Sequence, residues 1–187
     1  MSTDPEAGGR LLGFGQRVGG ITQMAYIVED MEAAIAWWVR DMRTGPWFLL
    51  DSFLGPDHVY RGEPARADVR IAMAFAGHMQ IELIQPKDDN PSVYREMIER
   101  RGYGFHHVGI ACEDVDAETE AYLARGYALA FTAGVPTGGH VAYLDGGPAQ
   151  PHFIELIPAT PGMDATFTGF WQASVNWNGN DPIRPFA

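Results

Sequence analysis

The stretch GFHHVGIACEDVDA, residues 104–117, has a counterpart 84 positions earlier in GITQMAYIVEDMEA, residues 20–33. Each begins with a short apolar run that favours a strand, passes through an acidic pair and continues with the spacing of a helix. A second match, IELI at 81–84 and again at 154–157, follows in the same order. Two matches in the same order indicate that the chain is built from two copies of one unit.

Each copy is predicted to contain a strand, a helix and then three more strands. In the first copy, Asp30 can cap the helix, and apolar alternation between turn residues predicts strands at 21–28, 47–53, 69–75 and 79–86. The stretch 54–67 is rich in Pro, Gly and charge and is predicted to be a loop. In the second copy, a helix at 115–125 ends at Gly126, and strands are predicted at 105–112, 127–132, 139–145 and 151–157. A helix at about 91–101, with Asn90 as its cap and Pro91 in its first turn, joins the copies.

Strand parity places four polar side chains on one face of the predicted sheet. Successive side chains on a strand point to opposite faces, and the branched neighbours of each IELI glutamate suit the face that a helix covers. Those helix-facing positions are Ile81, Leu83, Ile154 and Leu156, together with Met24, Tyr26, Val28, His106, Val108 and Ile110. The opposite face then carries Gln23, Glu82, His107 and Glu155, which a pseudo-twofold between the copies would bring together.

These four residues suit a divalent metal. A glutamate in the middle of an apolar strand is costly to bury unless it is paired or bound to a cation. Two carboxylates, one imidazole and one amide oxygen form a reasonable ligand set. Each residue alone also has an ordinary structural explanation, and only the repeat makes the four a set.

Over residues 20–158 this pattern resembles the vicinal-oxygen-chelate superfamily, which includes glyoxalase I, methylmalonyl-CoA epimerase, extradiol dioxygenases and bleomycin-resistance proteins. The segments VEDMEAAIAWW, QIELIQP and GFHHVGIACEDVDA look closer to a glyoxalase-like group related to methylmalonyl-CoA epimerase than to glyoxalase I. The resemblance implies an α+β fold, with two paired βαβββ modules that form a curved, cup-like mixed sheet around a central metal site. It also implies metal ligands on the first and fourth strands of each module, in an order similar to that of eukaryotic-type glyoxalase I: Gln23, Glu82, His107 and Glu155.

The function implied by the resemblance is that of a metal-dependent lyase, isomerase or epimerase. A Zn, Ni, Co, Mn or Mg ion would stabilise the enolate formed when a proton is removed beside a carbonyl. The substrate would be a small molecule with vicinal oxygens or a carbonyl. Glu155 and Glu82 are the candidate bases, and Glu155 is favoured by its likeness to the base position of glyoxalase I.

Two other functions stay open on this fold. An extradiol-type dioxygenase needs two histidines and one carboxylate on iron. A non-catalytic, resistance-type protein would bind a small molecule without metal. Residues proposed to line a substrate pocket are Trp47, Phe48, Tyr60, Phe75, Phe131, His140 and Tyr143, although core packing explains most of these aromatics equally well. His106 is predicted to be structural.

Length and charge set the remaining expectations. A length of 187 residues suits one domain, which is expected at 20–160. Residues 1–19 are rich in glycine and charge and are predicted to be a flexible leader, and residues 161–187 form an aromatic tail. Module one is expected at 20–101 and module two at 102–160. The tail is expected to pack on the body or on a partner subunit of a homodimer.

The net charge of −11 argues against a nucleic-acid partner. No apolar run is long enough to span a membrane, and the polar N-terminus lacks a signal-peptide pattern, so a cytoplasmic protein is expected. The single cysteine, Cys112, excludes an intramolecular disulfide and is expected to be buried.

Overall fold

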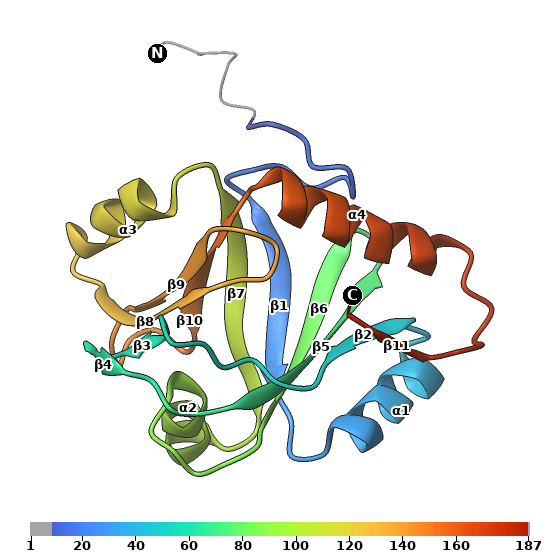
Figure 1. Ribbon diagram of the computed structural model, residues 1–187, viewed down its shortest axis with the longest axis horizontal. Helices are drawn as coiled ribbons and strands as arrows, with labels where there is room; N and C mark the ends of the chain where they lie inside the picture. Colours follow the sequence, from blue (N-terminus) through green and yellow to red (C-terminus); the bar gives the residue numbers. More distant parts are fainter. Residues whose placement is uncertain (1–8, 187) are drawn as a thin grey trace.

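The structure, a computed structural model, describes residues 9–186 and contains two modules whose first strands, β1 and β7, lie side by side (Figure 1). The elements of this module are β1 (Ile21–Ile27), α1 (Met31–Asp41), β2 (Trp47–Leu50), β3 (Val59–Tyr60), β4 (Glu63–Pro64), β5 (Val69–Ala76) and β6 (Met79–Pro86). After α2 (Val93–Arg101), the second module contains β7 (Gly104–Cys112), α3 (Val115–Leu123), β8 (Ala128–Gly134), β9 (His140–Asp145) and β10 (Phe153–Pro158). The chain continues with α4 (Pro161–Val175) and β11 (Ile183–Pro185).

The strands form one open, mixed sheet in the order β11-β2-β5-β6-β1-β7-β10-β9-β8-β3-β4. At its centre β1 and β7 run antiparallel, while β6 lies parallel to β1 and β10 lies parallel to β7. The two modules share one register, because Glu82 lies opposite Ala25 and Glu155 lies opposite Gly109. The predicted fold of paired βαβββ modules around a curved mixed sheet is therefore confirmed.

The outer face of the sheet is covered by α1 and α3. Met24, Tyr26 and Val28 pack with Met31 and Ile35 of α1. In the second module, Ile154 and Leu156 pack around Val115 of α3, together with the buried Cys112. Both helices begin at an aspartate cap, where Asp30 accepts from Ala33 N at 2.8 Å and Asp114 accepts from Ala117 N at 3.0 Å.

The inner, concave face carries two apolar clusters with the polar residues between them. One cluster contains Val93, Tyr94 and Met97 of α2, packed against strand residues such as Ile84. The other contains Met163, Phe167 and Phe170 of α4. Figure 1 shows these two helices near opposite ends of the central strands.

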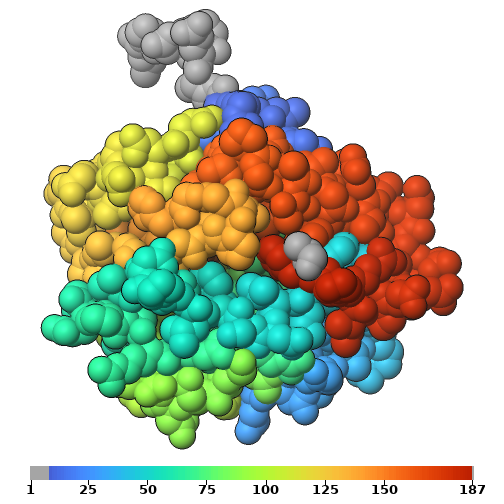
Figure 2. Space-filling model, in the orientation of Figure 1, coloured from blue at the N-terminus to red at the C-terminus, as the bar shows by residue number. Residues whose placement is uncertain are grey.

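A crossover segment closes much of that face. After β2 the chain runs to the far edge of the sheet, where β3 pairs with β8 of the second module. The predicted loop at 54–67 therefore contains two short strands, and the strand predicted at 47–53 ends at Leu50. In the space-filling view, the teal crossover, the orange segments and the red C-terminal segment together lie over the concave face (Figure 2).

The two ends of the described chain also pack on the body. Leu12 and Phe14 are buried, and the Phe14 ring contacts the rings of Phe75 and Phe167. Within the leader predicted at 1–19, Leu12, Phe14 and Val18 are therefore packed on the body, whereas positions 1–8 lie outside the part of the chain that the structure describes.

The C-terminal segment lies on the body as well. Phe170 of α4 stacks on Phe48, with ring centroids 3.8 Å apart, and β11 pairs in parallel with β2. Among the described residues, no helix has the length and apolarity needed to cross a membrane.

The cap of α2 differs from the prediction. The helix begins at Val93, and Ser92 rather than Asn90 accepts the hydrogen bond from Arg95 N, at 3.1 Å. Pro91 therefore lies before the cap. Serine is as strong a cap as asparagine, so local preference does not separate the two positions.

Candidate metal centre

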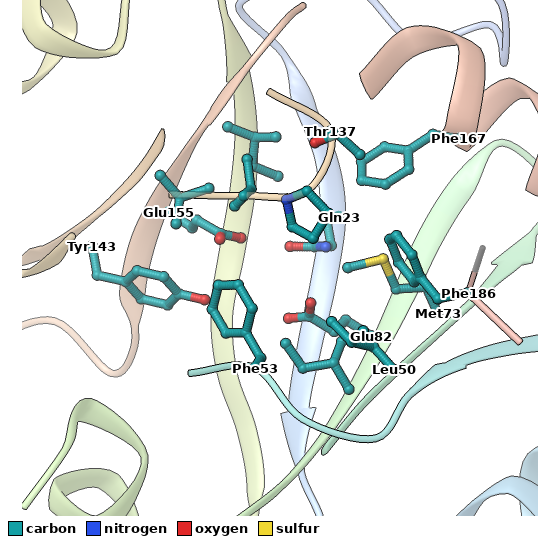
Figure 3. A pocket seen from close by; sticks show the side chains of 15 residues that line it. Gln23, Leu50, Phe53, Met73, Glu82, Thr137, Tyr143, Glu155, Phe167 and Phe186 are labelled. Atoms are coloured by element: carbon teal, nitrogen blue, oxygen red, sulfur yellow. The ribbon is translucent and has the colours of Figure 1, made fainter. Parts of the chain in front are cut away.

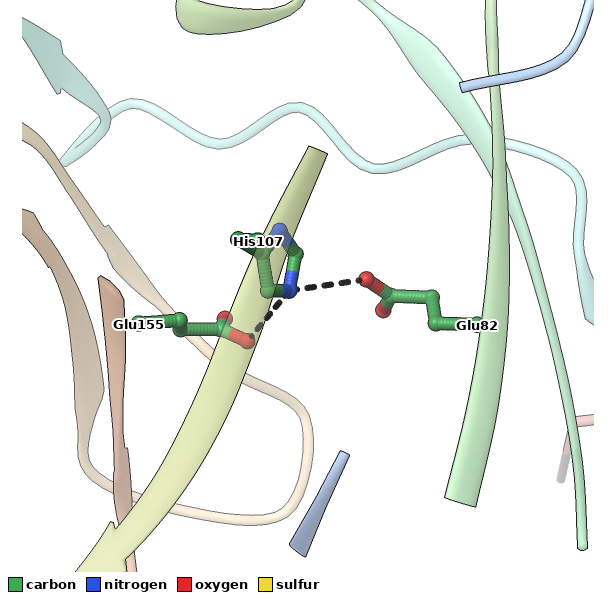
Figure 4. A group of neighbouring side chains, drawn as sticks. All are labelled: Glu82, His107 and Glu155. Atoms are coloured by element: carbon green, nitrogen blue, oxygen red, sulfur yellow. Dashed lines mark ion pairs between the residues drawn. The ribbon is translucent and has the colours of Figure 1, made fainter. Parts of the chain in front are cut away.

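Four side chains from the four central strands converge on the concave face. Nε2 of His107 lies 3.0 Å from Gln23 Oε1, 3.0 Å from Glu155 Oε2 and 3.4 Å from Glu82 Oε2. Figure 4 shows the imidazole between the two carboxylates. Each of the four residues is at most 6% exposed. The structure therefore brings together all four residues that strand parity placed on one face.

A single imidazole hydrogen cannot satisfy this arrangement. One imidazole nitrogen carries at most one hydrogen, while three oxygens surround it. Glu82 Oε2 and Glu155 Oε2 are both buried without a hydrogen-bond partner. Unpaired buried carboxylate oxygens are expensive, and a cation among the three oxygens and the nitrogen would satisfy all of them at once.

The spacing of the donor atoms also fits a divalent ion. Zinc bonds of about 2.0–2.2 Å in a tetrahedral site place neighbouring ligand atoms roughly 3.3–3.6 Å apart. Bonds of about 2.0–2.1 Å in an octahedral site place adjacent ligand atoms roughly 2.8–3.0 Å apart. The three distances from His107 Nε2 to the oxygens, 3.0–3.4 Å, lie across these two ranges.

Gln80 orients the amide of Gln23. Its Oε1 accepts a hydrogen bond from Gln23 Nε2 at 2.8 Å, which turns Gln23 Oε1 toward His107. Sequence reasoning missed this residue, although a signal was present. Gln80 is two positions before Glu82 on β6, and residues two apart on a strand share a face.

Gly109 is a second residue that the sequence analysis missed. A Cβ at this position would lie 2.8 Å from Gln23 Oε1 and 2.6 Å from a methyl group of Ile157. Because Gly109 pairs with Glu155, the missing side chain leaves room for the amide of Gln23 beside that glutamate. Glycine is needed at this position because there is no space for a side chain, and not because of its backbone conformation, since φ of Gly109 is not positive.

Burial and mutual repulsion shape the electrostatics of the centre. Burial raises the pKa of Glu82 well above its usual range, and the nearby Glu155 carboxylate raises it further. Burial also raises the pKa of Tyr143, and the Glu155 carboxylate adds to this shift, so the phenol keeps its proton. Both pKa values are raised because negative charge is buried away from water, and such an environment favours a bound cation.

His106 does not follow the predicted alternation. Ala25 pairs with His107 and Tyr26 pairs with Phe105, so His106 is an extra residue in a β-bulge of β7. Its Nδ1 lies 2.8 Å from Nδ1 of His107, and its ring packs near Tyr143. The expectation that the two histidines face opposite sides of the sheet is therefore wrong, and the bulge is the reason.

A cavity of about 50 Å³ is lined by three of the four residues, Gln23, Glu82 and Glu155. Figure 3 shows the Tyr143 hydroxyl and the side chains of Gln23, Glu82 and Glu155 turned toward its centre. The remaining wall is mostly apolar and includes Leu50, Phe53, Ile71, Met73, Val135, Pro136, Thr137, Val141, Ile157, Phe167 and Phe186. No lysine or arginine is among the described residues that line it.

Of the seven residues proposed for a substrate pocket, Tyr143 alone lines this cavity. Trp47 lies on the outer face, where its Nε1 donates to Thr44 O at 3.0 Å. Phe48 and Phe75 belong to the cluster under α4.

The other three proposed residues also point elsewhere. Tyr60 donates to Glu96 Oε2 at 3.0 Å, Phe131 packs in the cluster under α2, and His140 lies 3.1 Å from Asp116 at the surface. Residue type alone did not separate cavity walls from core.

The sequence model of the Glyoxalase/Bleomycin resistance protein/Dioxygenase superfamily matches residues 22–143. Methylmalonyl-CoA epimerase from Mycobacterium tuberculosis has 22% identity and a TM-score of 0.58, over 79% of this chain and 93% of that protein. A hypothetical protein from Bacillus halodurans has 20% identity and a TM-score of 0.57, over 75% of this chain and 94% of its own.

A Streptomyces coelicolor methylmalonyl-CoA epimerase variant, solved with 2-nitronate-propionyl-CoA, has 16% identity and a TM-score of 0.58, over 77% and 96% of the two chains. These identities show a shared fold. No curated protein sequence matches the chain. Because the family model covers well over half of the 187 residues, the chain belongs to the Glyoxalase/Bleomycin resistance protein/Dioxygenase superfamily, which is the vicinal-oxygen-chelate superfamily.

Proposed function

We propose that this protein is a divalent-metal-dependent enzyme that removes a proton beside a carbonyl, as an isomerase, epimerase or lyase. One observation carries the proposal: Gln23, Glu82 and Glu155 place oxygens within 3.0–3.4 Å of His107 Nε2 at the floor of a cavity. The neighbours of the same fold that are named methylmalonyl-CoA epimerase support this class of reaction.

The residues of the site have two roles, which are to bind the ion and to transfer the proton. Gln23, Glu82, His107 and Glu155 would hold the ion, which when bound would act as a Lewis acid that stabilises an enolate. Glu155, once released from the ion, takes the proton, and Glu82 is the second candidate for this role. Tyr143, which keeps its phenolic proton, can donate a hydrogen bond to an oxyanion in the cavity.

The shape of the cavity favours a compact substrate head. A cavity needs about 10–15 Å³ to hold one water molecule. The volume of about 50 Å³ therefore holds roughly four water-sized groups. The floor is polar, whereas Phe167, Phe186 and Met73 supply apolar walls. We therefore infer a substrate with two neighbouring oxygens, or one carbonyl, next to a small apolar group.

The dioxygenase alternative finds less support. Iron in that class takes two histidines and one carboxylate. His106 is adjacent in sequence, but its Nδ1 faces His107 and its Nε2 faces the carbonyl of Val93 at 3.3 Å. Among the described residues that meet at the floor, His107 is the single histidine.

A metal-free binding protein is also less well supported. Such a protein has no need for two buried glutamates that each have one carboxylate oxygen without a hydrogen-bond partner. Their burial costs stability in the absence of a cation. Homodimer formation stays a prediction.

Proton exchange tests the proposal without knowledge of the product. The metal-loaded protein is incubated in deuterated water with 2-oxo-hemithioacetals, 2-methyl-branched acyl thioesters and cyclic enones, and mass spectrometry detects deuterium beside the carbonyl. General-base catalysis typically contributes about 10²–10⁴-fold. We expect Glu155→Gln to slow exchange by that order and Glu82→Gln to slow it less.

The matched control is Glu118→Gln, the same chemical change on the exposed surface of α3. It should exchange at the wild-type rate. Wild-type exchange that persists unchanged in both buried variants would show that neither glutamate is the base.

A further inference from the structure

The imidazole rings of His106 and His107 are in direct contact through one nitrogen of each ring. Both imidazoles are fully buried, and their ring centroids are 5.1 Å apart at an angle of 74°. Nδ1 of each ring lies 2.8 Å from Nδ1 of the other. At this distance one hydrogen lies between the two nitrogens, so one ring donates and the other accepts.

The carbonyl of Val93 decides which ring donates. His106 Nε2 lies 3.3 Å from Val93 O, and a carbonyl oxygen can only accept. The hydrogen of a neutral His106 ring is therefore on Nε2, and its Nδ1 is a bare acceptor. The hydrogen between the two rings then belongs to Nδ1 of His107.

This order leaves Nε2 of a neutral His107 without a hydrogen. That nitrogen is the atom that Gln23 Oε1, Glu82 Oε2 and Glu155 Oε2 surround. A bare imidazole nitrogen is the form that binds a metal ion, and the hydrogen bond at the other nitrogen fixes which tautomer is present.

We propose that His106 is a positioning residue that accepts a hydrogen bond from His107 Nδ1 and thereby holds His107 Nε2 bare and directed at the cation site. This role rests on the proposed function, since it requires that the four residues bind an ion. The bulge serves the same purpose, because without the extra residue the two rings would lie on opposite faces of the sheet.

Two substitutions that introduce side chains of the same shape distinguish this role from a role in packing alone. Asparagine and leucine branch at the same atom and have similar size, but asparagine retains an oxygen close to where His106 Nδ1 lies. His106→Asn should bind Co²⁺ within about threefold of wild type, whereas His106→Leu should bind it about 10–100-fold more weakly. Competition with a chromophoric chelator gives the affinity, and the visible spectrum of bound Co²⁺ reports the ligand geometry.

Thermal unfolding of the metal-free variants is the second readout. A buried leucine needs no partner while a buried amide does, so His106→Leu should be at least as stable as His106→Asn without metal. If packing were the whole role of His106, affinity would follow stability and the leucine variant would bind at least as well. Equal Co²⁺ affinity in the two variants would overturn the inference. A wild-type protein that binds no divalent ion would overturn the proposed function and this inference together.

Discussion

Replacing Glu82 with glutamine should stabilise the metal-free protein. Glu82 Oε2 and Glu155 Oε2 are buried without partners, and an unsatisfied buried group costs about 1–3 kcal/mol. Glutamine carries no charge, and its amide can donate to Glu155. At pH 8 we expect the free energy of unfolding to rise by about 1–3 kcal/mol, which raises Tm by roughly 2–12 °C in a chain of this size.

The same substitution should change the pH dependence of stability. Burial, and then the Glu155 carboxylate, raise the pKa of Glu82, so the folded state holds this proton more tightly than the unfolded state. The metal-free wild type is therefore expected to lose stability as pH rises from about 4.3, the ordinary pKa of a glutamate, through the raised value. Glu82→Gln removes this group and should flatten the slope.

The assay is thermal unfolding by circular dichroism at pH 6 and pH 8, with a chelator and then with excess Zn²⁺. With Zn²⁺ the order should reverse, because the variant lacks one charged ligand and gains less from the ion. Glu118→Gln on the surface should follow the wild type throughout. If Glu82→Gln lowers Tm as much in chelator as in Zn²⁺, the two carboxylates are not unpaired in the metal-free protein and the reasoning is refuted.

Three further predictions follow from individual positions. Gly109→Ala should weaken Co²⁺ binding about tenfold or more in chelator competition, because the new methyl group would lie 2.8 Å from Gln23 Oε1; unchanged affinity would contradict this placement. Phe167→Ala should let the metal-loaded protein bind hydroxamates with larger acyl groups than wild type accepts, measured by calorimetry; an identical size limit would argue against Phe167 as a cavity wall. Asp30→Ala removes a helix cap and should cost about 0.5–2 kcal/mol in chemical denaturation with metal affinity unchanged, whereas loss of metal would tie α1 to the site.

The repeat and strand parity were sufficient to predict the order of elements in each module and to bring the four polar residues together, while the family resemblance supplied the curved sheet. IELI occurs at equivalent strands of both modules, and each glutamate pairs with a small residue, Ala25 or Gly109. Parity succeeds where strands pair residue for residue. It fails at His106, because the bulge depends on how β7 pairs with β1, and the local sequence does not record that pairing.

The cavity wall was beyond prediction from local patterns. Phe167 and Phe186 reach the cavity because α4 folds back over the sheet and β11 pairs with β2. Both contacts join segments far apart in the chain. Phe48 illustrates the converse, since an aromatic residue proposed for the pocket stacks instead on Phe170 of that same returning segment.

The most direct test of the account is the metal content of the protein purified without chelator, measured by mass spectrometry of the elements beside the His107→Ala variant. Both proteins should first be shown to be folded by circular dichroism. The account predicts about one Zn, Ni, Co, Mn or Mg ion per wild-type chain, and loss of most of that ion in the variant, because the imidazole nitrogen lies within 3.0–3.4 Å of all three oxygen donors. A folded wild-type chain that takes up none of these ions, or a variant that retains the full amount, would contradict the central claim.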